Sequence, residues 1–181
     1  MRNLGARTVT AMILLGTAVG TTLVVSAAAS GSDGRRSDGN SVRTDLSGYA
    51  EVPLALSSPG SGTFRARIDE RNKEIRYSLS YSDFPTRVTQ AHIHFGSVSQ
   101  AGGISAFLCT NLGNGPAGTP ACPPDGGTVE GTIKPADVVG PAGQGIAAGE
   151  FAELVAAIEA GATYANVHTD QFQAGEIRGQ I

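Results

Sequence analysis

The chain has 181 residues, which is enough for one domain with a sizeable core but not for two once an export leader is set aside. Basic and acidic residues number 13 and 16, a formal net charge of −3, which argues against nucleic acid or an anionic membrane as partner. Glycine is abundant at 25 residues, and Gly, Pro, Asn and Asp cut the apolar runs at short intervals. This texture is typical of all-β proteins.

The N-terminal residues 1–29 have the pattern of a signal peptide: two arginines, an apolar stretch over 9–25 and a run of small residues. An uncleaved anchor stays open as an alternative, because the stretch is at the lower edge of membrane-spanning length. Residues 30–43 offer almost nothing to bury and predict a disordered linker. We therefore expect a secreted or cell-envelope protein, with no membrane span after signal cleavage.

Strand signals then follow in order, beginning with a first strand over 46–52. Apolar and polar residues alternate over 63–69 and 74–81, which predicts an antiparallel hairpin with one buried face. From Glu150 the apolar residues recur at helical spacing, so one helix of about ten residues is expected, with Gly161 at its C-cap. The remaining strands are predicted at 88–95, 104–110, 128–133, 164–169 and 176–181.

All three histidines lie in two of these strands. His92 and His94 are two residues apart, so they share one face of their strand, and His168 has a similar apolar setting. Imidazole binds both copper and zinc, and three histidines would leave a fourth position for water or a carboxylate such as Asp170 or Glu176. We therefore consider a copper or zinc site at these histidines.

A purely structural interpretation of the histidines is the simpler alternative. The rings would then hydrogen-bond backbone and hydroxyl groups at the end of a sheet, with Asn166 and Thr169 as partners. No spacing rule brings the two histidine strands together. Metal binding therefore depends on whether the three imidazoles meet in the folded domain.

The chain's two cysteines bracket a segment rich in Gly and Pro. In an exported protein a disulfide between Cys109 and Cys122 is the expected arrangement. Two unrelated thiols are the alternative, but exposed free thiols outside the cell tend to oxidise. We predict the bridge.

Five blocks of sequence carry a family resemblance. They are LSG at 46–48, EVP at 51–53, AHIH at 91–94, IEAGATYANVHT at 158–169 and AGEIRGQI at 174–181. Together they resemble the CHRD domain, named after its repeats in the developmental protein chordin and also found as an exported bacterial domain. The resemblance covers 44–181 and is interrupted by the segment between the cysteines.

The resemblance implies an all-β domain with one short helix, as an antiparallel β-sandwich, immunoglobulin-like or a superoxide-dismutase-like barrel. It also implies an extracellular binding or structural module, with an extracellular protein or a cell-envelope glycan as partner. An extracellular copper- or zinc-binding protein using His92, His94 and His168 is the alternative.

Catalysis is not expected, because no nucleophile and base pair or other complete catalytic motif is present. A metal-dependent redox activity is the one enzymatic alternative that the histidines leave open. The remaining motif residues have structural interpretations: Glu176 and Arg178 share a face and can pair with a neighbouring strand, and Asn166 can satisfy backbone groups. Thr169 is grouped with them as a hydroxyl partner.

Overall fold

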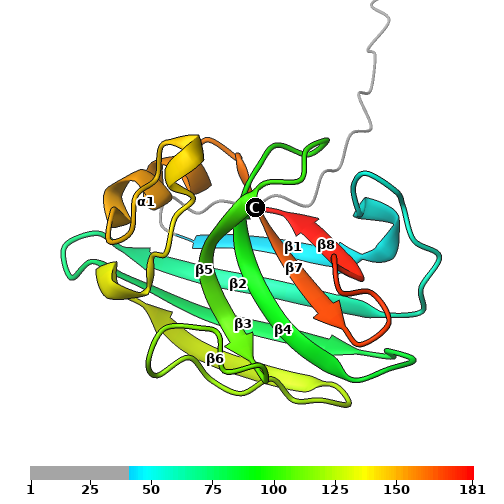
Figure 1. Ribbon diagram of the computed structural model, residues 1–181. Coiled ribbons are helices and arrows are strands. Elements are labelled where there is room, and N and C mark those ends of the chain that lie inside the picture. Colours follow the sequence, from blue (N-terminus) through cyan, green and yellow to red (C-terminus); the bar gives the residue numbers. More distant parts are fainter. Residues whose placement is uncertain (1–40) are drawn as a thin grey trace, which may run out of the picture. The chain divides into compact units, whose positions relative to one another are not determined.

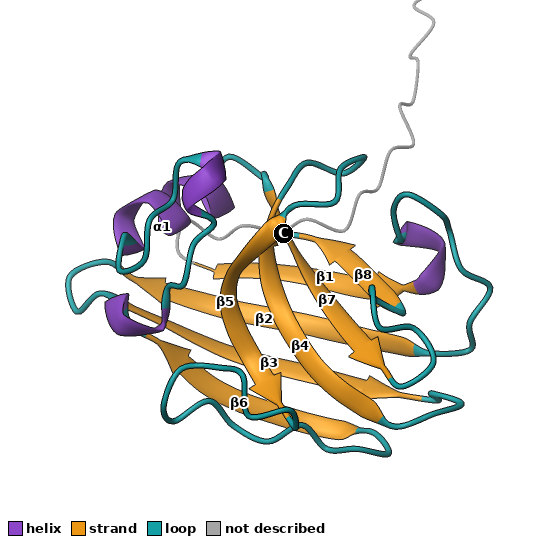
Figure 2. Ribbon diagram, in the orientation of Figure 1, coloured by secondary structure: helices purple, strands orange, loops and turns teal. Residues whose placement is uncertain are grey.

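The computed structural model describes residues 41–181, shown in Figures 1 and 2. The expected signal peptide, and the expected linker up to residue 40, lie outside the described residues. The strands are β1 (Ser41–Ser47), β2 (Ser61–Asp69), β3 (Glu74–Ser82), β4 (Val88–Phe95), β5 (Gly103–Thr110), β6 (Gly127–Ile133), β7 (Thr163–Thr169) and β8 (Ile177–Gln180). The helices are α1 (Phe151–Glu159) and the short 3-10 turns η1 (Gly48–Ala50), η2 (Pro135–Asp137) and η3 (Ala142–Gln144).

The eight strands form one sheet in the order β5-β4-β7-β8-β1-β2-β3-β6, and every neighbouring pair is antiparallel. The sheet curls so that its two end strands approach each other (Figure 1). Just after β6 in the chain, Val138 forms a β-bridge with Ala106 of β5, and the Val139 N–H donates to the Ser105 carbonyl at 2.9 Å. The fold is a nearly closed barrel with one short α-helix, which confirms the all-β prediction.

The β2–β3 hairpin illustrates how the sequence builds the core. Phe64 and Leu79 are directly opposed and buried at 1% and 0% exposure, while Arg65 between the core positions points outward. Alternating apolar residues from the other strands complete a single core cluster. At about 25 cal/mol per Å² of apolar surface removed from water, this cluster is the main stabilising contribution.

Helix α1 covers the core with one side. Phe151, Leu154, Val155 and Ile158 are buried, as the helical spacing predicts. The helix ends at Glu159 with Ala160 as its C-cap, and Gly161 follows with a φ of 65° in the left-handed region and an N–H that donates to the Ile158 carbonyl at 2.9 Å. The predicted start and length of the helix are confirmed, whereas the C-cap is Ala160 and the predicted Gly161 is the residue after it.

The first strand differs from its prediction at both ends. It begins at Ser41, because Val42 pairs with Ala66 and packs against the core, so residues 41–43 belong to the sheet and not to the expected linker. It ends at Ser47, because the Gly48 carbonyl accepts the N–H groups of Glu51 and Leu56 and turns the chain. The prediction of a strand over 46–52 was therefore wrong in its bounds, since alternation alone could not show this turn.

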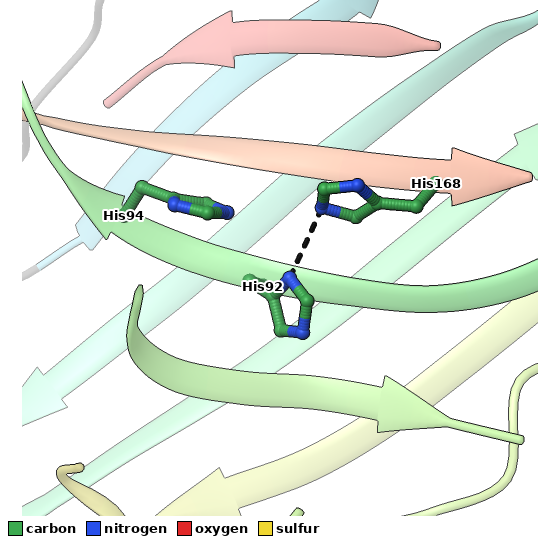
Figure 3. A group of neighbouring side chains, drawn as sticks. All are labelled: His92, His94 and His168. Carbon is green, nitrogen blue, oxygen red and sulfur yellow. Dashed lines mark hydrogen bonds between the residues drawn. The ribbon is translucent and has the colours of Figure 1, made fainter. Parts of the chain in front are cut away.

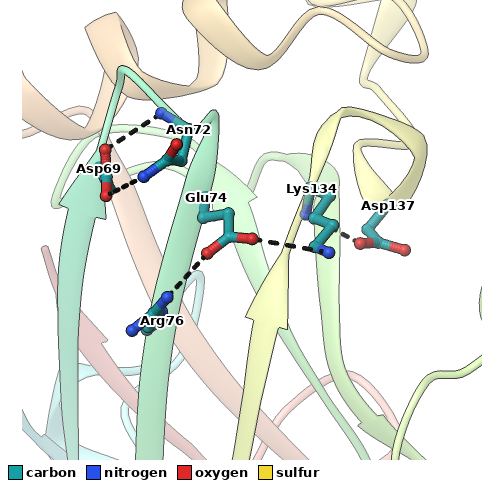
Figure 4. Close-up of polar contacts among 6 residues, drawn as sticks. All are labelled: Asp69, Asn72, Glu74, Arg76, Lys134 and Asp137. Carbon is teal, nitrogen blue, oxygen red and sulfur yellow. Dashed lines mark hydrogen bonds and ion pairs between the residues drawn. The ribbon is translucent and has the colours of Figure 1, made fainter.

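Polar contacts fix the turns at one end of the β2–β3 hairpin and of β6 (Figure 4). Asp69 accepts hydrogen bonds from the backbone and side-chain nitrogens of Asn72, and Glu74 pairs with Arg76 at 3.1 Å and with Lys134 at 3.5 Å. The Lys134 N–H donates to Asp137 at 2.8 Å. Because these ion pairs are largely exposed, each contributes well under about 1 kcal/mol, and their role is to hold the register.

Cys109 and Cys122 form the predicted disulfide, which confirms that prediction. Both residues are buried, at 0% and 3% exposure, and Asn111 bonds to the Val88 and Cys122 carbonyls beside them. A cross-link over 13 residues contributes about 3 kcal/mol in the chain-entropy model. The bridge therefore fastens a Gly- and Pro-rich loop to the barrel wall.

Within residues 41–181 no helix is long and apolar enough to cross a membrane.

Candidate functional site

A layer of polar side chains covers the outer face of β4, β7 and β8; we call it the polar layer. Its members are His92, His94, Tyr164, Asn166, His168 and Arg178. Ala91 and Ile93 of β4 belong to the core, so the intervening histidines point outward. Strand register brings the members together, because Asn166 lies opposite both His92 and Arg178, and Tyr164 lies opposite His94.

The polar layer is buried although it lies on the outer face of the sheet. His92 is 0% exposed, His94 8% and His168 5%. Two loops close over these residues, 96–102 between β4 and β5 and 170–176 between β7 and β8. The site is therefore a second buried region, separated from the apolar core by the sheet itself.

The three imidazole rings face one another in Figure 3. His92 Nδ1 lies 3.0 Å from His168 Nε2, and one nitrogen of each of the three rings falls within 4.8 Å of the others. Ligand bonds of about 2.1 Å would place donors roughly 3.4 Å apart around a tetrahedral ion. The two nitrogens that lie farthest apart must therefore approach each other by about 1.4 Å, which rotations of the rings can supply.

Backbone carbonyls fix the tautomers of two rings. His94 Nδ1 lies 2.9 Å from the Gly102 oxygen and His168 Nδ1 lies 3.0 Å from the Gln173 oxygen. A carbonyl oxygen only accepts, so each Nδ1 carries the proton and each Nε2 presents a lone pair inward. This is the outer hydrogen bond that metal-ligating histidines typically make.

Two ring nitrogens in the cluster have no partner. The Nε2 atoms of His94 and His92 are buried and find no hydrogen-bond partner within the described part of the chain. A buried polar atom left unpaired costs about 1–3 kcal/mol. An ion between the rings would satisfy His94 Nε2, whereas His92 presents Nδ1 to the other two rings (Figure 3).

Burial keeps all three rings neutral. Desolvation lowers the pKa of His94 to about 4, although its bond to the Gly102 carbonyl opposes the shift. Desolvation also lowers the pKa of His92 and of His168, and for His92 the two neighbouring imidazoles add to the effect. Neutral imidazole is the form that binds a metal, so the site is prepared for ligation well below neutral pH.

Arg178 and Tyr164 extend the cluster from His94. The Tyr164 ring stacks on His94 with centroids 4.8 Å apart and an interplanar angle of 5°, and the Arg178 guanidinium lies 3.5 Å from the Tyr164 centroid. Arg178 also donates to the carbonyls of Ser97 and Gln100 at 2.8 and 3.0 Å. It therefore fastens the 96–102 loop over the histidines, whereas the sequence predicted pairing with a neighbouring strand.

Glu176, Thr169 and Asn166 form a second set of contacts beside the histidines. Glu176 is fully buried and accepts hydrogen bonds from Thr169 and Ser58, both at 2.5 Å. Asn166 donates to Glu51 at 2.6 Å and to the Ile177 carbonyl at 2.9 Å. Asn166 and Thr169 thus bind carboxylates, and neither is the histidine partner that the structural interpretation of the sequence required.

No carboxylate joins the three histidines. Among residues 41–181 the group of potential ligands consists of His92, His94 and His168 alone. The oxygens of Glu176 are occupied by the hydroxyls of Ser58 and Thr169. The sequence suggestion that Asp170 or Glu176 supplies a fourth ligand finds no support in this arrangement.

Sequence reasoning missed Glu51 and Tyr164 as members of the site. Glu51 is 115 residues from Asn166, so no local pattern connects them. Burial raises the pKa of the Glu51 carboxyl to about 7. The absence of a side chain at Gly175 allows Asn166 and Glu51 to meet: its φ is 130°, and a Cβ there would lie 2.5 Å from Asn166 Oδ1. The EVP and AGE blocks could be recognised in the sequence, but the sequence did not show that they lie side by side in the folded domain.

Comparison with known proteins gave one family. The model of the CHRD domain matches residues 42–181, which spans almost all of the described chain and includes every member of the polar layer. Searches of curated proteins and of solved structures gave no match.

Proposed function

The chain belongs to the CHRD domain family, an extracellular-type binding module, and from that premise we propose that it is an exported protein whose ligand is a copper or zinc ion. The observation that carries the proposal is the convergence of His92, His94 and His168, with one nitrogen from each within 4.8 Å of the others. Three neutral imidazoles are a chemically suitable ligand set for either metal.

The hydrogen bonds around the rings support this proposal over a purely structural role. Two rings are oriented by backbone carbonyls so that their free lone pairs point into the cluster. A structural cluster would be expected to pair its buried nitrogens, yet His94 Nε2, which faces the other two rings, is unpaired within residues 41–181. We assign no catalytic step, because the polar layer supplies no nucleophile with an adjacent base.

Metal binding is expected to be stoichiometric and to stabilise the domain. Protein purified from its native compartment should contain about one copper or zinc per chain, and chelation should lower its melting temperature. A ligand at a hundred times its dissociation constant contributes about 2.7 kcal/mol, which for a domain of this size corresponds to roughly 5–10 °C. Elemental analysis and thermal denaturation with and without chelator measure both effects.

Matched variants separate binding from folding. His94→Gln removes one ligand and should abolish the chelator-dependent shift, whereas Gln90→Ala, on the same strand and face but outside the triad, should keep it. Equal metal content in wild type and His94→Gln would contradict the proposal. So would a melting temperature that copper, zinc and chelator all leave unchanged.

Glycan binding is the second candidate function, and a specific surface favours it. Arg43 lies directly opposite Arg65, and Arg67 directly opposite Arg76, on the outer face of β1, β2 and β3. These four arginines line a shallow depression of about 750 Å³, which Glu130 also borders. Like charges directly opposed across strands destabilise a sheet, and a bound anion would relieve the repulsion.

An anionic cell-envelope glycan is the partner that this surface fits. Arg43 pairs with Asp45 at 3.6 Å and Arg76 with Glu74 at 3.1 Å, whereas Arg65 and Arg67 appear in no ion pair of residues 41–181. We expect binding to polygalacturonate but not to neutral dextran, and an affinity loss of about tenfold in R65A/R67A, equivalent to about 1.4 kcal/mol. Binding to double-stranded DNA as tight as to polygalacturonate, or an unaffected double variant, would contradict glycan recognition.

A further inference from the structure

We propose that the three-histidine site selects cuprous copper, Cu(I), over Zn(II) and Cu(II). The inference rests on the proposed metal-binding function and specifies the ion and its charge. It is drawn from three properties of the polar layer: the number of donors, the charge around them and their burial. Each of these distinguishes a monovalent from a divalent ion.

The number of donors favours Cu(I). Zinc sites are almost always four-coordinate, and Cu(II) prefers four nitrogen or oxygen ligands in a tetragonal arrangement. Within the described chain His92, His94 and His168 stand alone as a ligand group, with no carboxylate or thiolate. Cu(I) shares the d¹⁰ configuration of Zn(II) but carries a single charge and is stable with two or three ligands, so three imidazoles can complete its coordination.

Burial makes water a poor substitute for the missing fourth ligand. The three histidines are 0%, 8% and 5% exposed, and the Phe107 ring meets His92 edge to face with centroids 4.5 Å apart. Tyr164 stacks against the other side of the cluster, on His94. A zinc-bound water would therefore need space and hydrogen-bond partners in a region closed by rings and loops.

The charged side chain of the polar layer is the cation of Arg178, and Glu51, a carboxyl group that interacts with it, is held partly neutral because burial raises its pKa to about 7. The Arg178 guanidinium stacks on Tyr164, which stacks on His94, so its positive charge lies within about 8 Å of that ring. The Born cost of burying an ion rises with the square of its charge, and the three ligands are neutral. An ion bound at His94 Nε2 would lie about 8–11 Å from Arg178, where a second positive charge lowers affinity by about ten- to thirtyfold at an effective dielectric constant of 20.

Binding of the metal ion requires a change of tautomer in the His92 ring only. His168 Nδ1 donates to Gln173, so in the empty site His92 Nδ1 must donate its proton to His168 Nε2. When an ion takes the place of this hydrogen bond, the His92 proton moves to Nε2, on the ring that Phe107 contacts. All three ligands stay neutral, no net proton is released, and the loaded site carries the charge of the ion.

Anaerobic competition with colorimetric chelators tests the selectivity. The apoprotein should withdraw one equivalent of Cu(I) from bicinchoninate while leaving Zn(II) with 4-(2-pyridylazo)resorcinol. The expected preference for Cu(I) is at least about tenfold, from the charge of Arg178 alone. X-ray absorption of the copper-loaded protein should show three nitrogen neighbours.

Charge variants test the cause. Arg178→Gln should reduce the preference for Cu(I) by about ten- to thirtyfold, whereas Arg178→Lys, which keeps the charge, should preserve it. Because Arg178 is buried, Phe107→Glu provides a second test at a half-buried position: a carboxylate beside His92 should raise Zn(II) affinity relative to Cu(I).

The outcomes separate this inference from the proposed function. Zinc bound as tightly as Cu(I), with one equivalent lost in His94→Gln, would overturn the selectivity and leave the metal site standing. Binding of neither ion, or equal binding in His94→Gln, would overturn both. Unchanged preference in Phe107→Glu and Arg178→Gln would show that charge does not set the selectivity.

Discussion

Acidification of the metal-free protein from pH 7 to pH 4 is expected to lower its free energy of unfolding by on the order of 5 kcal/mol. The cause is the burial of the histidines, which lowers the pKa of His92, His94 and His168 in the folded state, to about 4 for His94. In the unfolded chain the same rings titrate near 6.5. The unfolded state therefore binds more protons below pH 6.5, and stability is lost as the pH falls from there towards the folded values.

The Glu51 carboxyl has the opposite effect on the free energy of unfolding over the same pH range. Desolvation raises its folded pKa to about 7, so the folded state binds the extra proton and this contribution is lost as the pH rises through 7. On acidification the single Glu51 carboxyl therefore offsets part of the stability that the three histidines lose. Glu51→Gln should make the loss of stability steeper, which distinguishes the two contributions.

Urea denaturation at several pH values, with a chelator present, measures this dependence. His94→Gln should remove about 3 kcal/mol of the dependence, which corresponds to the shift from about 6.5 to about 4. A midpoint that stays constant from pH 7 to pH 4 in wild type would show that the folded state charges its histidines as easily as the unfolded chain does.

Arg178→Ala is expected to lower the free energy of unfolding by about 4 kcal/mol, a large effect for a residue on the outer face of a sheet. The side chain is 2% exposed, and it donates to the carbonyls of Ser97 and Gln100. Removing it leaves these two acceptors unpaired, at about 1–3 kcal/mol each, and ends the cation–π contact with Tyr164, worth about 1–2 kcal/mol.

Two further variants test that explanation. Arg178→Lys keeps a charge but not the planar fork that reaches two carbonyls, so an intermediate loss is expected. Arg65→Ala removes an exposed arginine from β2 and should change stability by less than about 0.5 kcal/mol. Similar midpoints for Arg178→Ala and Arg65→Ala would show that the 96–102 loop does not depend on Arg178.

The sequence predicted most of the barrel because alternation is a local property. Phe64, Ala66 and Ile68 alternate with arginines on β2, and that pattern fixes both the strand and its buried face. The end of β1 was predicted wrongly, because it depends on two N–H groups that return to Gly48 from residues 51 and 56. Such a turn is a tertiary feature with no periodic signal.

The candidate site was predictable in its residues but not in its environment. His92 and His94 were recognised from their spacing, and His168 because it is the third histidine. Their burial comes from two loops that cover the outer face, and outward positions of an antiparallel sheet are normally expected to be solvated. The contacts of Arg178 with Ser97 and Gln100 span about 80 residues of sequence, so local reasoning could not supply them.

The strand order has a consequence for assembly of the domain. β5, β4 and β7 form one group of adjacent strands and β1, β2, β3 and β6 form another, and β8 pairs with both β7 and β1. Ile177–Gln180 is the last of the described strands, so before this short segment is synthesised the two groups can meet only through the bridge between Ala106 and Val138. Until then Arg178 is missing from the polar layer, and a chain released early would leave β7 and β1 as open strand edges, which favours aggregation and proteolysis.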